Sequence, residues 1–508
     1  MIYAYLLLIA AVARLSFWTE SFGNSVDESN YMAIAEAWDH YGRIYIDAVD
    51  RKPPLLYAFY WAIGKTFGFF HLHAVHLVAL LGTFGLAILA DNWARRIDLT
   101  NPKGLTAFLV ILTSSSLSRE VLALNSELVM MFFLFPALYW LSQINFYDLR
   151  ISQPLKLFVL GFFLGLACLV KQIAVLPIGF VALLLWIWAV QEKLFIVTLK
   201  RTLILLMGFA TSLVALVLMM NFAGDWQAFL NWVVFENLSY IKDAEKSVTQ
   251  SRTAFSLLVP LLVSLLWLGL WIGSFLSYKN HKRNPVFLVV LGASLGSLLS
   301  IYLGSRLFSH YFVPLLFFFP LLASAGFSKL QQGKWKKAIL ALTLLPFLFF
   351  AFFNPARDFW IRNFSATTKI HSFDRATQAK LREIANAVQA RTLHGERICV
   401  WGMAGQIFLL ASRGSGTRFV YTDYVSGRLA GFQSSESHPH PFAMSLFLED
   451  LENKKPALFI DLSGSRINDY QFFPIENYPP LKDYLLTHYE KDDVVLGADL
   501  WKRKTITP

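Results

Sequence analysis

The sequence predicts a polytopic α-helical membrane protein that carries a small α/β domain at its C-terminal end. Of its 508 residues, 56% are hydrophobic and only 16% are charged. Long apolar runs recur through residues 1–355, and a helix needs about 20 such residues to cross a hydrocarbon core of ~30 Å. Beyond residue 356 the apolar runs become short. We therefore expect a transmembrane domain over 1–355, with a first outer loop over 19–54, and an extracytoplasmic domain over 356–508.

The charge distribution argues against a nucleic-acid-binding protein. The net charge is +11, but the basic residues are spread over short loops between apolar runs instead of forming a stripe. The two cysteines, Cys168 and Cys399, fall in an apolar run and in the polar C-terminal region, so no disulfide between them is expected. Membrane lipids, and no nucleic acid, are the expected partners.

The apolar runs divide into about eleven spans, or up to about thirteen. The first run lacks a basic start and contains Arg14, which favours a retained span over a cleaved signal peptide. The segment 55–70 follows two prolines and is expected to be juxtamembrane or re-entrant. Dividing 156–190 into two spans requires a hinge at Lys171. The predicted spans lie near 2–18, 73–94, 104–118, 122–142, 156–170, 173–190, 203–222, 255–277, 286–304, 311–327 and 338–354.

Lysine and arginine predict the orientation, because cytoplasmic loops carry an excess of both. The N terminus is then cytoplasmic, while the first outer loop, the 223–254 loop and residues 356–508 lie on the outer, or periplasmic, side of the inner (plasma) membrane. The basic residues of the alternate loops are Arg95, Arg96, Lys103, Arg150, Lys156, Lys193, Lys200, Arg201, Lys279, Lys282, Arg283, Lys329, Lys334, Lys336 and Lys337.

The C-terminal region shows the pattern of a small α/β domain. Apolar segments at 397–402 and 457–463 predict buried strands, and amphipathic segments at 375–390 and 443–454 predict helices. Strands that alternate with helices favour an α/β arrangement. The glycines of 401–406 do not form a dinucleotide-binding fingerprint.

A capping-box pattern opens the predicted helix of the first outer loop. Ser25 stands three residues before Glu28, so Glu28 is explained equally well as a helix cap and as a functional acid. The cap leaves Asp27 without a structural task, which makes it the candidate general base. Tyr31 begins an apolar face, and we expect this helix to lie on the membrane surface with Tyr31 toward a cavity.

Lys52 stands directly before Pro53-Pro54 in the same loop. Residues before proline favour an extended backbone, so the ammonium is expected on a stiff segment beside the bilayer. It suits a lipid phosphate at headgroup depth. The alternative is a lysine that extends to the membrane interface without a ligand.

Further polar residues stand at the outer ends of predicted spans. Lys171, Arg306 and His310 suit a phosphate, and Tyr311 beside them suits an acceptor cavity. The alternatives are a turn at Lys171 and interfacial anchoring of the other three. Glu127 enters an apolar run, which favours a polar cavity unless the span only begins there.

A pair of small residues precedes Lys171 in its apolar run. Gly161 and Gly165 are spaced for close contact between two helices.

Motifs of several other enzyme classes are missing from the sequence. It contains no Asp-x-Asp pair, no His/Cys cluster with zinc spacing, no Walker A sequence and no Gly-x-Ser-x-Gly.

Residues 1–325 resemble the integral-membrane glycosyltransferases of the GT-C fold, in the branch of the protein O-mannosyltransferases and the lipid A aminoarabinose transferase. The first outer loop of that branch carries an Asp-Glu pair, a Tyr and a Lys-Pro-Pro-Leu run, which stand here as Asp27, Glu28, Tyr31 and residues 52–55. The stretches 165–172 and 305–314 resemble family segments more loosely.

The resemblance implies an enzyme that moves a sugar from a polyprenyl-phosphate donor to an acceptor hydroxyl with inversion. It assigns the general base to Asp27 and donor-phosphate binding to Lys52, with Arg306 as a second phosphate contact and Glu127 as a further acidic position. The acceptor is then an envelope glycan, lipid A or its core, or a protein. No cofactor is implied, although a divalent metal between Asp27 and the phosphate remains open.

Two other classes also account for parts of the sequence. A lipid or sugar transporter is polytopic as well, but its ionisable groups are expected near mid-span, whereas these gather at outer helix ends. A purely structural or interaction protein does not explain the Lys-Pro-Pro segment.

Overall fold

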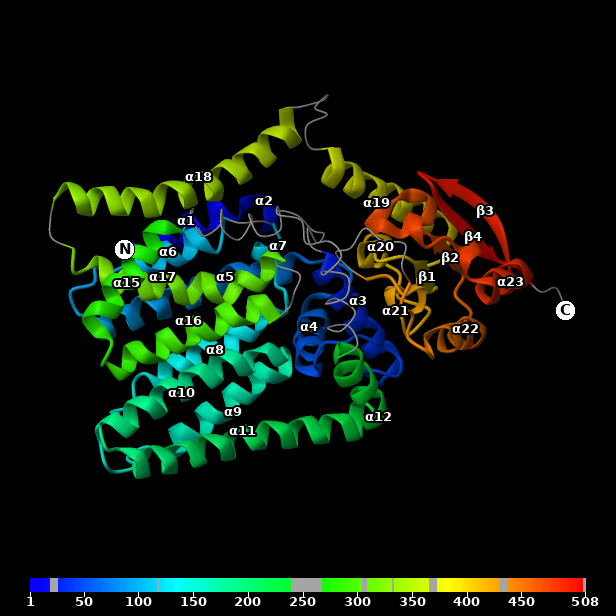
Figure 1. The fold of residues 1–508 in the computed structure, drawn as a ribbon. Coiled ribbons are helices and arrows are strands. Elements are labelled where there is room, and N and C mark those ends of the chain that lie inside the picture. The colour runs from blue at the N-terminus through cyan, green and yellow to red at the C-terminus, as the bar shows by residue number, and fades with distance from the viewer. Residues whose placement is uncertain are drawn as a thin grey trace. The chain divides into compact units, whose positions relative to one another are not determined.

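The computed structural model describes residues 1–18, 26–116, 119–238, 267–303, 308–330, 333–364, 372–429 and 437–505 (Figure 1). The chain folds into two compact units, each assembled from separate stretches. The helical unit comprises Met1–Thr19, His76–Leu218 and Val248–Phe364. The sheet unit comprises Glu20–Val75, Met219–Ser247 and Ser365–Pro508. The boundaries of these units are set by compactness alone, and the functional division near residue 355 stays a prediction.

The helical unit is built from apolar helices. Six of the described helical stretches are long and apolar enough to cross a membrane, so the count of eleven spans stays a prediction. The elements are α1 Ile2–Ala13, α2 Leu15–Trp18, α5 His73–Ile97, α6 Leu105–Thr113, α7 Arg119–Leu122, α8 Ser126–Leu141, α9 Pro154–Val170, η1 Gln172–Ala174, α10 Val175–Gln191, α11 Phe195–Ala223, α15 Leu268–His281, α16 Pro285–Leu303, η3 Ser309–Phe312, α17 Val313–Phe327 and α18 Lys334–Phe364.

The predicted break at Lys171 is confirmed. Lys171 has an extended backbone between α9 and the short helix η1, which leads into α10. The first half of the predicted span 255–277 lies outside the described residues, and the second half falls in α15.

Glycines allow several helices of this unit to touch backbone to backbone. A side-chain carbon added at Gly161 of α9 would lie 1.9 Å from the carbonyl oxygen of Leu205 in α11, and one at Gly165 would lie 1.9 Å from Ser212 Oγ. The predicted small-residue contact is therefore confirmed. Helix α17 lies at the centre, since all 15 of its residues are buried.

The sheet unit surrounds a four-stranded sheet in the order β1-β2-β4-β3. Strands β1 and β2 pair in parallel, as two strands joined through helices do, whereas β4 is antiparallel to both of its neighbours. The elements are α3 Val26–Tyr41, α4 Pro54–Phe67, α12 Trp226–Phe229, the π-helix η2 Leu230–Phe235, α19 Ser372–Arg391, β1 Ile398–Trp401, α20 Gly405–Ala411, α21 Asp423–Ser426, α22 Ala443–Lys454, β2 Leu458–Asp461, η5 Ser463–Ser465, η6 Ile467–Phe472, η7 Ile475–Asn477, α23 Pro479–His488, β3 Tyr489–Val495 and β4 Ala498–Arg503.

The two strands and two helices expected in the C-terminal region are present, but the hairpin β3–β4 was not predicted. Strand β3 begins Tyr-Glu-Lys-Asp-Asp and is largely exposed, as suits an edge strand protected by charge. Leu496 and Gly497 both have positive φ, which is the backbone of a tight two-residue hairpin turn. The turn lacks the Asn-Gly or Asp-Gly signal that identifies such hairpins in a sequence.

The expectation that α3 lies on a membrane surface is wrong. Its residues from Glu28 to Ala35 are buried on every side, because α4 and α20 pack against it. The amide of Gly405, at the start of α20, donates a 3.0 Å hydrogen bond to the side-chain oxygen of Asn30. A surface helix and an interior helix share the same apolar spacing, and only the packed partners distinguish them.

Candidate functional site

The first turn of α3 carries the Asp-Glu pair. The carboxylate of Glu28 is fully buried and that of Asp27 is partly exposed. Both act on Tyr60 of α4: burial raises the pKa of Tyr60 well above its usual value, and the negative charges of Glu28 and then Asp27 raise it further. Ser25 lies outside the described residues, so the capping box stays a prediction.

Tyr31 lies next to this pair in an aromatic cluster. Its ring meets those of Tyr57 and Tyr60 edge to face, at 6.1 and 5.5 Å between centroids. Such packing fixes α3 against α4. A role for Tyr31 in an acceptor cavity stays a prediction.

The segment that leads to Lys52 is held by a buried carboxylate that sequence analysis did not identify. Asp50 accepts hydrogen bonds from the hydroxyls of Tyr421 at 2.6 Å, Tyr424 at 2.9 Å and Tyr57. The backbone amide of Arg51 donates to it at 2.6 Å. Burial by itself raises the pKa of Asp50, but the charge of Lys52 and the phenolic donors together hold it below its usual value. Asp50 is therefore ionised at neutral pH.

Further hydrogen bonds fix the backbone on both sides of Arg51. The hydroxyl of Tyr45 donates to the carbonyl of Lys52 at 2.8 Å, and the amide of Asn237 donates to the carbonyl of Arg51 at 2.7 Å. The Arg51 guanidinium lies over the ring of Tyr424 at 5.2 Å. The backbone that carries the Lys52 side chain is therefore constrained by hydrogen bonds on several sides, as a preorganised ligand contact requires.

The helical unit contains a second polar cluster. Lys171 is ion-paired with Glu127, and its ammonium lies 4.8 Å from the centre of the Tyr311 ring. His310 places Nε2 3.9 Å from Glu127 and Nδ1 3.2 Å from Glu120. The structure therefore brings together four of the residues proposed from the sequence, and it adds Glu120.

Local structure explains how this cluster forms. Asn125 caps α8 by accepting a 3.3 Å hydrogen bond from the amide of Leu128, which places Glu127 in the first helical turn. The short helix η3 carries His310 and Tyr311, and the hydroxyl of Ser309 donates to Glu120 at 2.7 Å. Arg306 lies outside the described residues.

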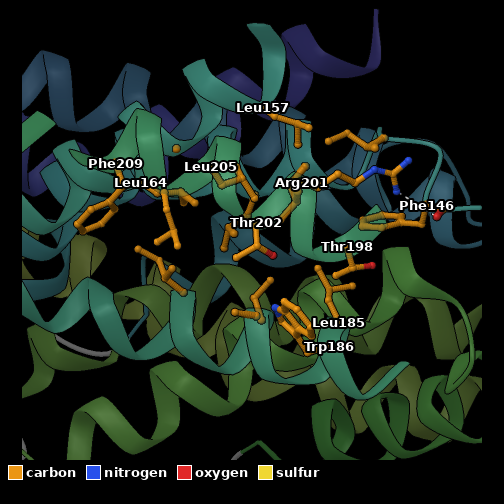
Figure 2. Close-up of a pocket in the computed structure, with 18 of the residues that line it drawn as sticks. Phe146, Leu157, Leu164, Leu185, Trp186, Thr198, Arg201, Thr202, Leu205 and Phe209 are labelled. Atoms are coloured by element: carbon orange, nitrogen blue, oxygen red, sulfur yellow. Dashed lines mark hydrogen bonds between the residues drawn. The ribbon is translucent and has the colours of Figure 1, made fainter. Parts of the chain in front are cut away.

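An apolar cavity of about 150 Å³ lies among α8, α9, α10 and α11 (Figure 2). Leu157, Leu164, Leu205 and Phe209 line much of it. Arg201 is the one cation among the described lining residues, and it donates to four main-chain carbonyls of residues 145–150, at 2.6 to 3.4 Å. The guanidinium therefore fastens a loop, and the cavity suits hydrocarbon better than phosphate.

A metal site is not evident in the part of the chain that the structure describes. No three His, Cys, Asp or Glu side chains converge there in a way that would hold an ion. The possible metal between Asp27 and a phosphate is untested.

The fold matches solved membrane glycosyltransferases over nearly the whole chain. ArnT from Cupriavidus metallidurans bound to undecaprenyl phosphate is similar, with a TM-score of 0.63 and 13% identity, covering 99% of this chain and 98% of that chain. The same protein in the apo state gives 0.58 and 13%, over 98% and 97%. An Archaeoglobus fulgidus oligosaccharyltransferase in complex with Zn and sulfate gives 0.50 and 13%, over 99% of this chain and 73% of that chain.

No family model matches the sequence, and none of the curated proteins matches it. The structural likeness, at this low identity, establishes the fold. The chain is a multi-pass membrane protein with the GT-C fold, as its sequence predicted. The solved proteins that this chain matches are glycosyltransferases, and one of them was captured with undecaprenyl phosphate.

Proposed function

We propose that this chain is an inverting glycosyltransferase that moves a sugar from a polyprenyl-phosphate donor to an acceptor hydroxyl. The acceptor belongs to an envelope glycan, to lipid A or its core, or to a protein. The enzyme lies in the inner (plasma) membrane with its N terminus in the cytoplasm and residues 356–508 outside, where lipid-linked sugars replace nucleotide donors. The observation that carries the proposal is the rigid mounting of Lys52 by Asp50 and its tyrosines.

Lys52 is the proposed contact for the donor phosphate. In the part of the chain that the structure describes, no carboxylate lies within ion-pair distance of its ammonium, so the positive charge is available to a ligand. As the bond between the sugar and the phosphate oxygen breaks, negative charge grows on the departing polyprenyl phosphate. A fixed cation stabilises that charge more in the transition state than in the ground state. Arg306 is the proposed second contact.

Asp27 is the proposed general base. Its carboxylate takes the proton of the acceptor hydroxyl as the acceptor oxygen forms a bond to the anomeric carbon from the face opposite the phosphate. Asp27 is partly exposed whereas Glu28 is buried, so Asp27 is better placed to meet a substrate. We assign Glu28 to shaping this turn together with Tyr60.

The cluster in the helical unit has a different proposed task. Lys171 already neutralises Glu127, so its contribution to phosphate binding is expected to be smaller than that of Lys52. Lys171 and His310 instead hold Glu127 and Tyr311 in place at the outer end of α8 and α17.

The test is donor turnover by purified full-length protein in proteoliposomes with radiolabelled polyprenyl-phosphate sugars. We expect release of polyprenyl phosphate together with a glycosylated product, and loss of both in Asp27→Asn. The matched control is Asp39→Asn, a carboxylate on the same helix that pairs with Lys65. Movement of intact donor across the bilayer without a new glycosidic bond would refute the proposal and indicate a transporter.

A further inference from the structure

A second cavity, of about 240 Å³, lies wholly within the sheet unit. Four segments of the chain form it: the first outer loop, the turn and helices that follow α11, Arg418 between α20 and α21, and the stretch that leads into α22. The walls that matter for its chemistry are Tyr45, Asp225, Asn231, Trp232, His440 and Phe442. A site of this volume holds one small ring rather than a drug-sized ligand, since pockets for the latter measure about 300–1,000 Å³.

The lining combines aromatic rings with planar polar groups. Phe442 is 63% exposed, whereas Trp232 is buried and its ring lies tilted against that of His440, with 4.3 Å between ring centres. Gln227 donates to Asn231 at 3.1 Å, and Asp225 caps α12. Rings offer apolar area at low entropic cost, and amides and carboxylates hydrogen-bond hydroxyl groups. This combination suits a polyhydroxylated ring.

The charges of the cavity disfavour an anionic ligand. The guanidinium of Arg418 is already held by Asp450, at 2.8 Å through Nε and 3.0 Å through Nη2. Burial lowers the pKa of His440, so its imidazole is neutral at neutral pH. Asp225 adds a negative charge. A phosphate would therefore meet no uncompensated cation among the described lining residues, whereas neutral hydroxyl groups would find acceptors.

The cavity shares its walls with the mounting of Lys52. Tyr45 lines it, and the hydroxyl of the same residue donates to the carbonyl of Lys52. The ring of Trp232 meets that of Tyr424 edge to face at 5.3 Å, and Tyr424 donates to Asp50. Trp232 stands in the π-helix η2, and such irregular turns are frequent at functional sites.

From this chemistry and this location, we propose that the cavity binds one neutral sugar ring of a glycan acceptor, close to where the donor phosphate is held. The inference rests on the proposed function, because it makes this ring part of the acceptor. It also narrows the acceptor class to molecules that contain a sugar.

Saturation-transfer NMR tests the binding directly, with full-length protein in a detergent that carries no sugar. The probes are the methyl glycosides of mannose, glucose and galactose, with an acetylated Ala-Thr-Ala amide as the peptide probe. We expect ring protons of at least one glycoside to receive saturation. The signal should fall at least threefold in the double variant Phe442→Ala, Gln227→Ala, whose positions are exposed enough for the chain to fold.

The matched control is Leu486→Ala, another exposed apolar side chain of the same unit, at 53%, and it should leave the signal unchanged. Equal glycoside signals in the double variant and the wild type would overturn the proposal, and so would a signal from the peptide alone. Hydrolysis of the donor without acceptor, measured on the same samples, reports on the proposed function separately. If the protein binds the glycoside through these residues but never consumes donor, the sugar-binding site is supported and the proposed glycosyltransferase activity is refuted.

Discussion

The two polar clusters hold their buried carboxylates in different ways. In the sheet unit, the hydroxyls of Tyr57, Tyr421 and Tyr424 satisfy Asp50, and these donors are neutral. In the helical unit, the ammonium of Lys171 satisfies Glu127. Whether a lysine is available to a ligand therefore depends on which groups already neutralise or hydrogen-bond the carboxylate beside it. The charge of Lys52 acts on Asp50 without a direct ion pair among the described contacts and so stays open to a ligand, whereas the ion pair with Glu127 uses much of the charge of Lys171.

The largest expected effect is on the proposed base. Asp27→Asn keeps the shape and removes the basicity, so turnover should fall by ~10²–10⁴-fold. Glu28→Gln should lose less, because Gln is also accepted at that position of a capping box. Steady-state turnover at matched protein levels distinguishes them.

Exhaustive chelation is the control for this pair of variants. If activity survives it, a metal bridge to Asp27 is excluded. Near-normal turnover in Asp27→Asn with an inactive Glu28→Gln would reverse the two roles.

The second-largest expected effect is on stability and concerns the ion pair between Lys171 and Glu127. Lys171→Met leaves Glu127 buried without its main cation, which typically destabilises by about 3–5 kcal/mol. Adding Glu127→Gln should recover part of this loss, because the two residues act as a pair. Thermal unfolding of the four proteins measures the coupling. Strictly additive losses would show that Lys171 and Glu127 are independent.

Lys52→Ala should do the opposite of Lys171→Met: donor use falls and stability barely changes. Losing a charged hydrogen bond to the phosphate costs about 1.5–3 kcal/mol, which is ~10–100-fold in kcat/KM for the donor. Lys52→Arg should rescue only partly, since a planar fork does not replace a compact ammonium. Unchanged donor kinetics in Lys52→Ala would remove the phosphate assignment.

Removing a tyrosine hydroxyl from Asp50 should have a smaller effect on donor use, because it only disturbs the position of Lys52. Tyr421→Phe and Tyr424→Phe each delete one hydroxyl donor to Asp50, and we expect KM for the donor to rise by less than ~10-fold with little change in kcat. Tyr484→Phe, which loses a hydrogen bond to Glu452 at the surface, is the control. A fall in kcat with no change in KM would argue against a role for these hydroxyls in positioning Lys52.

The smallest expected effect is on stability and concerns Asp461, a buried carboxylate that has neither tyrosine donors nor an ion pair among the described contacts. Asp461, at the end of β2, is buried with hydrogen bonds only from Ser463 among the contacts that the structure describes, and burial raises its pKa from 3.8 to about 6. The folded protein therefore retains a proton that the unfolded chain releases, and stability is lost as pH rises from about 4 to 6.

Asp461→Asn mimics the protonated acid. It should raise Tm by a few degrees above pH 6 and leave it unchanged near pH 4. Thermal scans across this range check the sign. A lower Tm for the variant at pH 7 would show that the ionised carboxylate is stabilising.

The local pattern of the sequence determined much of the helical framework. Apolar length located most helices, and the break at Lys171 follows from a polar pair inside a run that is too long for one span. Gly161 and Gly165 indicated a close contact without indicating α11 as the partner. Of the sheet, only β1 and β2 were predictable, because buried strands are apolar, whereas the charged edge strand β3 resembles a loop.

Tertiary structure alone decided what surrounds each candidate residue. Asp50 is one acid among several in its loop, and nothing local shows that Tyr421 and Tyr424 reach it across some 370 positions of sequence. The pairing of Lys171 with Glu127, the burial of α3 and the cavity beside Trp232 depend equally on distant segments. A sequence fixes which side chains carry charge and how each stretch folds locally. Which charges meet, and which remain for a ligand, follows from long-range packing.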